Sequence, residues 1–498
     1  MEISILVENG KKLSTAIQST IRITKTKKPP KYVDARNNID SILAEANHVI
    51  FGRRGSGKSA LMFASKDAAS PDSLSVFIDC EDLKDRPYPD VILEILILIN
   101  RQIIHSLGFK GIILNLRSYL SLKKLSRTLN DLKQRPLVVE KDIAEEISGQ
   151  FSADTEVVAG SLSKKFSVQE KKRFVKLEAI RRDISEWRDT IDSVREKIGK
   201  KKILIFVDDF YQLPSIHHAE IADILHRICK QSGLYFKIST IRHRSQLYKE
   251  EKGQPFGIQS VHDYQSVDLD FSLERFSEAR DALKAILCGI AETVNLQKGD
   301  VDQFFMGKGM DRLVEASGGV PRDFLSLLAG FLNNSLLQSK QPLGKDGVRD
   351  LAGNYFQAKR TDMNTDAEKG ESEQLMVLFD QINEFCLSKK KNTFMVDRAF
   401  VSDNTIFFQR LLKLADFRLI HRISSSRSNP TVVGKSFDTY MLDIGCYSYM
   451  RKLSGKLSEI DLTKNEKTLI DELRTAPIFD PISLQSKEMI ATPSGESN

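Results

Sequence analysis

The sequence predicts an α/β fold, in which a mainly parallel sheet is flanked by helices and is followed by smaller domains. Three observations support this prediction. Short apolar runs that fit buried strands alternate with helix-like segments between residues 32 and 270. A glycine-rich loop separates the first such run from a helix, and later runs end in polar side chains. Parallel strands gather their carboxyl ends at one edge of a sheet, where ligands bind.

Composition bounds the class of protein. A chain of 498 residues is too long for one ordinary core, so about two to four domains are expected. Apolar residues at 41% and charged residues at 28% are typical of a soluble globular protein. The net charge of +7 is compatible with nucleic acid but does not by itself indicate it.

Two short segments and the cysteines indicate where the protein is located and whether it contacts a membrane. Residues 1–7 contain an early acid and a very short apolar run, so no signal peptide is expected. Residues 91–99 are too few to span a bilayer and are expected to form a buried helix. The cysteines lie far apart without a C-x-x-C pair, which argues against a zinc site or a disulfide framework and favours a cytoplasmic location.

Residues 52–59 read GRRGSGKS and fit G-x-x-x-x-G-K-[ST], the phosphate-binding P-loop. Glycines let the backbone turn and bring its N–H groups close to phosphate oxygens. Lys58 can reach the β- and γ-phosphates, and Ser59 can hold Mg²⁺. A strand over 48–51 and a helix from residue 60 complete the order that the motif requires. We therefore expect ATP and Mg²⁺ to bind, with contacts from Gly52, Arg53, Arg54, Gly55, Ser56, Gly57, Lys58, Ser59 and Ala60.

A strand over 202–208 ends in two acids. Asp208 would hold Mg²⁺, through water and opposite Ser59. Asp209 stands where a water-activating carboxylate is needed. Its side chain is one methylene shorter than that of glutamate, so we expect slow hydrolysis. The alternative is that the pair caps the turn after the strand.

A further strand, over 234–242, also ends in polar groups. Ser239 and Thr240 would lie near the phosphates, and the Arg242 guanidinium could bond γ-phosphate oxygens and so distinguish ATP from ADP. A surface salt bridge is the alternative for Arg242. Arg244 could instead be an arginine finger offered to a neighbouring subunit.

A second basic turn lies in a region that is expected to be wholly helical, over 273–340. Residues 319–322 read GVPR, which places Pro321 near the first turn of a helix and leaves Arg322 beside free N–H groups. Such a turn could bind a phosphate or the edge of a base. A helix start without any binding role explains these residues equally well.

The remaining segments suggest the domain organisation. The side chains Ile180, Ile184, Trp187, Ile191, Val194 and Ile198 form a helical seam that is expected to pack on the sheet or on an antiparallel helix. The predicted domains are a flexible basic segment (1–31), an ATPase core (32–270) with a helical insertion (110–200), a helical lid (271–355), a linker (356–372), a compact unit (373–455) and a partly disordered tail (456–498).

The compact unit is expected to be a winged helix. Helices are predicted over 375–387 and 402–415, and two strands over 418–425 and 432–441 flank a hairpin turn. Basic residues are expected to cluster on this wing and to contact nucleic acid or a partner protein, and both possibilities stay open: Arg418, His421, Arg422, Arg427 and Lys435.

These motifs together resemble the STAND and initiator-type branch of the AAA+ ATPases. Residues 32–36, YVDAR, resemble the leading segment that contributes an arginine near the nucleotide base, so the resemblance assigns that role to Arg36. Asp208 and Asp209 resemble the D-D form of the Walker B motif, residues 239–242 resemble sensor 1, and residues 319–322 resemble the lid and sensor 2 motifs.

The resemblance covers roughly residues 32–450 and implies a helical lid, a winged helix, and ATP and Mg²⁺ as cofactors. It implies an oligomeric ATP-dependent switch that acts on partner proteins, in a setting such as bacterial defence. The alternative is a DNA-binding initiator, transposition or repair ATPase. A third interpretation is a scaffold that binds ATP without hydrolysing it.

Overall fold

The computed structural model describes residues 3–21, 32–134, 168–251, 254–366, 370–448 and 457–481. Two compact units divide the chain: Asn37–Phe51 with Leu61–Asp268, and Met1–Arg36 with Gly52–Ala60 and Leu269–Asn498. The predicted basic run at 25–31 and parts of the predicted insertion (135–167) and tail (482–498) lie outside the described residues.

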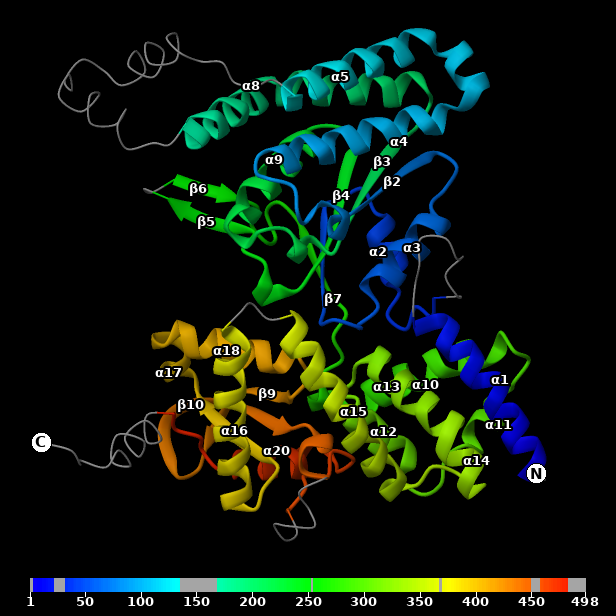
Figure 1. Ribbon diagram of the computed structural model, residues 1–498, viewed down its shortest axis with the longest axis vertical. Coiled ribbons are helices and arrows are strands. Elements are labelled where there is room, and N and C mark those ends of the chain that lie inside the picture. Colours follow the sequence, from blue (N-terminus) through cyan, green and yellow to red (C-terminus); the bar gives the residue numbers. More distant parts are fainter. Residues whose placement is uncertain are drawn as a thin grey trace, which may run out of the picture. The chain divides into compact units, whose positions relative to one another are not determined.

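A five-stranded parallel sheet forms the centre of the first unit (Figure 1). Its interior strands are almost continuously buried, as parallel strands covered on both faces should be. The predicted α/β architecture is confirmed; β7, with only Val267 buried, is an additional short edge strand. The strand order is β2 (Ser73–Asp79), β3 (Lys202–Asp208), β4 (Leu234–Thr240), β1 (His48–Phe51) and β7 (Gln265–Asp268).

Helices cover both faces of this sheet. Val76 and Ile78 of β2 belong to the same core cluster as the apolar side chains of α4 (Asp90–Leu114) and α9 (His218–Cys229). On the opposite face the Phe77 ring stacks on Phe63 of α3 (Lys58–Ala68), with 4.4 Å between ring centroids. Helix α2 (Asn38–Leu43) precedes β1.

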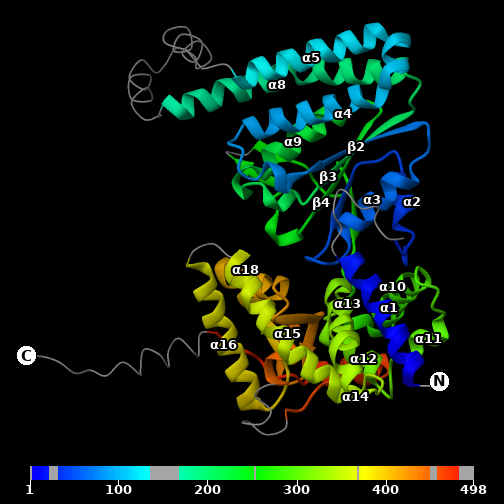
Figure 2. The same cartoon turned by 45° about the vertical axis from the view of Figure 1, so that its right-hand side comes forward.

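Two further helices, α5 (Leu116–Gln134) and α8 (Val168–Lys197), form a layer beyond α4 (Figure 2). The predicted seam of α8 is buried from Ile180 to Val194 and packs against α5 and α9, as expected. A two-stranded hairpin, β5 (Tyr248–Glu251) and β6 (Gln254–Gly257), follows β4 and contacts α9.

Among the described residues one stretch, Asp90–Phe109 of α4, is long and apolar enough to cross a membrane by length and composition. Half of it is buried, and Ile92, Ile95 and Ile99 lie in the core against the sheet. Core helices of soluble proteins pass the same test. The predicted buried helix over 91–99 is therefore part of α4.

The second unit begins with a helix that the sequence analysis missed. Residues 3–21 form α1 (Ile3–Ile21), so the prediction of a flexible segment is wrong there. Leu6, Leu13 and Ile17 recur at helical spacing and are buried against α10 and α13. The Ser14 hydroxyl also donates to the Asn333 side chain at 2.6 Å.

The helical region that follows comprises α10 (Phe276–Glu292), α11 (Lys298–Asp302), α12 (Gly309–Ala316), α13 (Pro321–Gly330), α14 (Leu336–Ser339) and α15 (Lys345–Asp366). The predicted linker over 356–372 is wrong as far as residue 366, because α15 continues through it. Phe356, Lys359 and Met363 are buried, and their spacing of 3 or 4 residues places them on one helix face.

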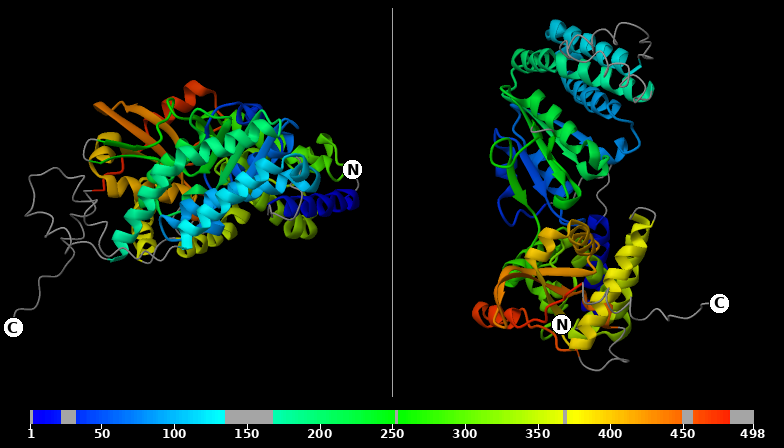
Figure 3. Two further views of the ribbon diagram at one scale, coloured as in Figure 1. Left: turned by 90° about the horizontal axis from the view of Figure 1, so that it is seen from above. Right: turned by 90° about the vertical axis from the view of Figure 1, so that its left-hand side faces the viewer.

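The C-terminal part of the second unit has the element order α16 (Glu371–Lys389), β8 (Thr393–Asp397), α17 (Arg398–Asp403), α18 (Thr405–Asp416), β9 (Ile420–Asn429) and β10 (Val432–Leu442). The strands form an antiparallel sheet in the order β8-β10-β9 (Figure 3, orange). The predicted helices and hairpin of this region correspond to α16, α18, β9 and β10.

The tail is ordered as far as it is described. It contains α20 (Glu466–Arg474), and Leu469, Leu473 and Phe479 are buried. The backbone N–H of Met395 donates to Pro477 O at 2.8 Å, and Phe479 N–H donates back to Met395 O at 2.8 Å. The predicted partial disorder of the tail (456–498) therefore does not apply to residues 457–481.

Lys237 of β4 should make stability depend on pH. Its fully buried ammonium contacts Ala44 O at 2.9 Å and His48 Nδ1 at 3.0 Å. Burial, assisted by the charge of Lys202, lowers its pKa from 10.5 to about 7. The unfolded chain then binds more protons between these values, so the free energy of unfolding should rise with pH from about 7 to 10.5, by up to about 1.4 kcal/mol per pH unit.

Urea unfolding of wild type and Lys237→Met across pH 7 to 10 measures this slope. We expect the variant to lose most of it, whatever its absolute stability. Equal slopes in both proteins would contradict the assignment.

Candidate functional site

The phosphate-binding loop lies between β1 and α3. Gly55 and Gly57 have φ of +89° and +97°, in the region that side chains with a Cβ disfavour. A Cβ at Gly52 would lie 2.3 Å from Ser56 Oγ, so this tight turn also requires glycine. Because α3 begins at Lys58, the loop feeds directly into a helix N-terminus with unpaired N–H groups.

Lys58 is held against the loop. Its Nζ donates to Gly52 O at 2.9 Å and to Arg53 O at 3.2 Å, and the side chain is buried. Ser56 Oγ is buried and has no hydrogen-bond partner among the described residues. Ser59 and Ala60 follow in the first turn of α3. A positioned ammonium, an unpaired buried hydroxyl and free helix N–H groups fit the polyphosphate that the motif predicts.

The arginines around the loop have different surroundings. Arg53 braces the loop: its N–H donates to Asp270 Oδ1 at 2.9 Å and its Nη2 to Gly318 O at 3.0 Å. Arg54 is exposed. Arg36 is exposed and lies 4.4 Å over the Phe271 ring, with Nη1 3.4 Å from Asp270 O.

Arg322 joins α13 to the loop. Its N–H donates to Gly55 O at 3.2 Å, and Pro321 precedes it in the first turn. Burial lowers the pKa of Arg322, and the nearby guanidiniums of Arg54 and Arg418 lower it further. A bound anion would favour the charged form of Arg322, because it would oppose the effects of burial and of the two neighbouring guanidiniums.

Behind this turn lies a set of buried charges. Arg418 pairs with Asp323 at 3.1 Å, Lys359 Nζ with Asp443 Oδ2 at 2.6 Å, and His421 Nε2 with Asp443 Oδ2 at 3.0 Å. Burial alone would raise the pKa of Asp443, but the Lys359 charge and the His421 hydrogen bond outweigh it and lower the pKa. These pairs tie α13, α15 and β9 together.

His421 also contacts the turn before α13. A Cβ on Gly318, whose φ is +60°, would lie 2.2 Å from His421 Nδ1, and Gly318 O accepts from Arg53. Burial lowers the pKa of His421; the bond with Asp443 opposes this, and the charges of Lys359 and Arg53 reinforce it. Gly318 therefore lies between the phosphate loop and β9.

The predicted basic wing requires correction. Arg418 and His421 are buried in the charge set just described, so they are not on a surface that could contact nucleic acid or a partner. Arg422, 46% exposed, pairs with Asp438 at 3.5 Å, Lys435 pairs with Asp397 at 2.6 Å, and Arg427 pairs with Glu274.

The strand-end acids lie at the carboxyl edge of the parallel sheet, in the other unit. Because Val207 of β3 is opposite Ile238 of β4, Asp208 and Ser239 are neighbours. Ser239 Oγ donates to Asp208 Oδ1 and accepts from Asp209 N–H at 3.0 Å. Ser239 thus orients the Asp208 carboxylate, while Asp209 adopts a left-handed φ of 50°.

Arg242 lies beyond the end of β4. Its guanidinium is 3.9 Å over the Phe51 ring and 3.4 Å from Asp268 Oδ2, and it is 58% exposed. Thr240 Oγ1 hydrogen-bonds to Ser245, and Arg244 lies 5.4 Å over Tyr211. The predicted alternative for Arg242, a surface salt bridge, is present as the ion pair with Asp268. Its predicted role towards a γ-phosphate remains a prediction.

The donors present suit a hydrated magnesium ion. Ser59 in one unit offers a hydroxyl, and Asp208 in the other unit offers an oriented carboxylate. That the two hold one ion stays a prediction. The described residues contain no group of three or more His, Cys, Asp or Glu side chains that could hold a metal.

No protein-family model matches the sequence, and no curated protein does. Solved structures similar to this chain include a Walker-type ATPase of Pyrococcus abyssi (10% identity, TM-score 0.39, covering 86% of this chain and 99% of that one). They also include the Aeropyrum pernix ORC1 protein in complex with DNA (10%, 0.34, 90% and 92%) and Drosophila ORC bound to DNA (11%, 0.35, 89% and 91%). Because each TM-score is below 0.5, we base the assignment on the loop and sheet of this chain.

Several contributing residues were missed by sequence analysis. Asp270 holds the loop backbone, and Asp323, Lys359 and Asp443 form the buried charge set. None belongs to a local motif, and their partners are far away in the sequence. The sequence offers one signal of the buried charge set. Lys359 lies on the same face of α15 as Phe356 and Met363, which are buried. The P-loop motif thus follows β1 of a parallel sheet that is flanked by helices, which is the arrangement of the P-loop NTPase fold.

The loop geometry predicts unequal effects of two alanine substitutions. Both Gly55→Ala and Gly57→Ala should cost about 1–2 kcal/mol of backbone strain. Only Gly55→Ala adds a clash, because its Cβ would lie 2.7 Å from Arg322 Cβ, whereas nothing lies within 4 Å of a Cβ at Gly57. Thermal unfolding without nucleotide should therefore show the larger loss for Gly55→Ala; equal losses would show that the contact with α13 does not matter.

Proposed function

We propose that this protein is an ATP-binding, slowly hydrolysing molecular switch of AAA+/STAND type, whose nucleotide state controls its assembly with copies of itself or with partner proteins. One observation supports this most directly: the loop carbonyl of Gly55 accepts from Arg322, next to the Asp323–Arg418 pair that reaches the C-terminal sheet. A nucleotide bound to the loop would therefore lie beside Arg322, and the next residue, Asp323, pairs with the arginine that precedes β9. The family resemblance supports the same function.

In this proposal the loop N–H groups and Lys58 bind the phosphates. Ser59 and the Ser239-oriented Asp208 hold Mg²⁺, which when bound neutralises charge on the β- and γ-oxygens. Asp209 takes the proton of the attacking water. Arg322, Arg242 and Arg54 are the cations that would distinguish a triphosphate from a diphosphate.

The energetics are sufficient for a switch. A ligand shifts a conformational equilibrium only by its difference in affinity for the two states. A reversal from 1:99 to 99:1 needs about 5.5 kcal/mol, and a hydrogen bond to a charged group contributes about 1.5–3 kcal/mol. About two to four bonds made by the γ-phosphate would therefore suffice.

Light scattering of the purified protein with ADP, with a non-hydrolysable ATP analogue and without nucleotide tests this function. We expect the ATP analogue to change the assembly state. Lys58→Ala should bind nucleotide about ten- to a hundredfold more weakly and should not respond, because it loses charge-assisted bonds to the phosphates. The same mass under all conditions in wild type would refute the switch.

Asp209→Asn separates a hydrolysing switch from a scaffold. If Asp209 activates water, the variant should bind nucleotide and assemble normally but lose phosphate release by at least about tenfold. Phosphate release that is unchanged by Asp209→Asn, measured under single-turnover conditions, would remove Asp209 from the mechanism.

A DNA-binding ATPase is the second candidate. The order α16-β8-α17-α18-β9-β10 with an antiparallel sheet supports a winged helix, and Arg422, Arg427 and Lys435 lie on its hairpin strands. An acid neutralises each of the three, which favours a protein partner over DNA. Affinity for duplex DNA that falls steeply with salt would support the second candidate, because phosphate contacts release counterions.

A cytoplasmic location belongs to the same proposal. All of the cysteines are free thiols, which suits a reducing compartment.

A further inference from the structure

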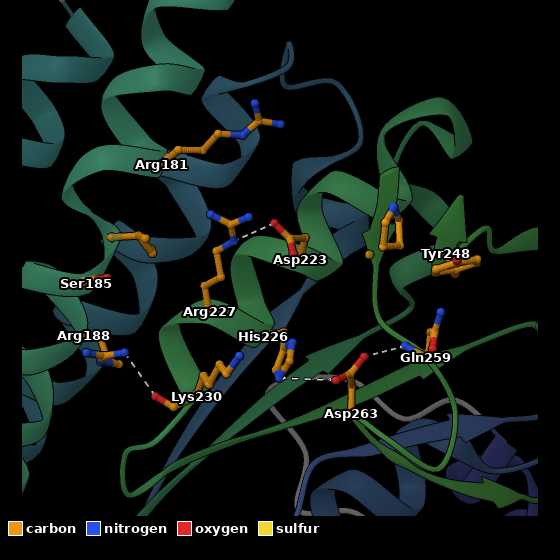
Figure 4. Close-up of a pocket in the computed structure, with 13 residues that line it drawn as sticks. Arg181, Ser185, Arg188, Asp223, His226, Arg227, Lys230, Tyr248, Gln259 and Asp263 are labelled. Atoms are coloured by element: carbon orange, nitrogen blue, oxygen red, sulfur yellow. Dashed lines mark hydrogen bonds and ion pairs between the residues drawn. The ribbon is translucent and has the colours of Figure 1, made fainter. Parts of the chain in front are cut away.

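A solvent-facing groove lies between α8, α9 and the β5–β6 hairpin, within the unit that contains the parallel sheet (Figure 4). Its volume is about 560 Å³, which is within the usual size of small-molecule sites. It shares no residue with the phosphate-binding loop or with the strand-end acids. Nothing in the proposed switch mechanism uses it.

Positive side chains dominate the groove. Arg181 and Arg188 come from α8, Arg227 from α9 and Lys230 from the residue that follows α9. Among the residues that the structure describes, the acids that line it are Asp223 and Asp263, so four permanent cations face two carboxylates there. The groove therefore attracts anions.

The two groove arginines are held in place by acids, and hydrogen-bond donors of the cations remain without an acceptor among the described residues. Arg227 Nε is held by Asp223 at 2.8 Å, and among the described residues its terminal amino groups have no acceptor. Arg188 is fixed by Asp189 at 2.7 Å and donates to Lys230 O at 3.3 Å. The Lys230 ammonium has no partner among the described residues, and the side chain is exposed.

An aromatic ring occupies the opposite wall. Tyr248, the first residue of β5, is 38% exposed, and Gln259 offers an exposed amide beside it. Figure 4 shows Tyr248 and Gln259 on the side of the groove that faces Arg227. An exposed ring next to guanidinium groups provides a stacking surface for a base together with donors for a phosphate.

We propose that this groove binds a nucleotide unit, with its phosphate on Arg188, Arg227 and Lys230 and its base on Tyr248. The unit can belong to a free nucleotide or to a single-stranded oligonucleotide, since both present the same chemistry. An acidic peptide would satisfy the cations but has no group that requires the exposed ring.

Fluorescence anisotropy of a labelled 12-mer of oligothymidylate, with unlabelled dTMP as competitor, tests the proposal. The full chain carries Lys58→Ala so that the phosphate-binding loop is impaired. Binding of the 12-mer without competition by millimolar dTMP identifies a strand, and competition by dTMP identifies a site for the free unit. Binding of neither, or capture only of polyglutamate, overturns the proposal.

Two matched pairs of variants locate the site. Lys230→Gln should weaken 12-mer binding at least about fivefold and reduce the salt slope by about 0.7, the value for one phosphate contact on a single strand. Lys201→Gln removes the same charge from an exposed lysine outside the groove and should change little. Tyr248→Ala should weaken binding about tenfold, whereas Tyr248→Phe should retain stacking and affinity.

Equal effects of Lys230→Gln and Lys201→Gln would overturn the site, provided that both variants show wild-type thermal unfolding. Failure of the proposed switch is a separate result. ATP binding to wild type reports the loop, and 12-mer binding to Lys58→Ala reports the groove.

Discussion

The hydrogen bond from the Arg322 N–H to the Gly55 carbonyl joins α13 to the phosphate-binding loop, and the candidate site of the second unit depends on this contact. It brings Arg322 of α13 to the phosphate-binding loop, which already carries the guanidinium groups of Arg53 and Arg54. Burial lowers the pKa of Arg322, and the charges of Arg54 and Arg418 lower it further against the opposing charge of Asp323. A polyphosphate is the natural counterion, because several fixed cations act together in a partly buried site where charge interactions are strong.

This contact gains its wider importance from the charges behind it. Asp323 follows Arg322 directly and pairs with Arg418, and the Lys359–Asp443–His421 set continues into β9 and the loop after β10. Losing one partner of a buried ion pair costs about 3–5 kcal/mol. These pairs therefore link the start of β9 and the loop after β10 to α13 and α15.

In the parallel sheet, the order of the strands determines which side chains meet at its carboxyl edge. β4 lies between β1 and β3, so its terminal Ser239 meets Asp208, and Arg242 beyond it reaches Phe51 at the end of β1. The carboxylate is oriented by a hydroxyl from the adjacent strand before any metal is present. Preorganisation of this kind reduces the cost of assembling a site around its ligand.

What the sequence determined by itself was the loop, the buried strands and the acids at their ends. The loop residues are contiguous, and each is required by local backbone geometry, as the left-handed Gly55 and Gly57 illustrate. Strands such as 203–207 are recognisable because burial on both faces demands an unbroken apolar run.

Only the tertiary structure determined whether the other charged residues are buried or exposed. Arg418 and His421 belong to a basic run that looks like an exposed wing, yet both are buried against acids from distant segments. The groove cations likewise come from α8 and α9, separated along the chain. Whether a charge faces solvent or a carboxylate depends on which elements pack together, and no local pattern specifies that.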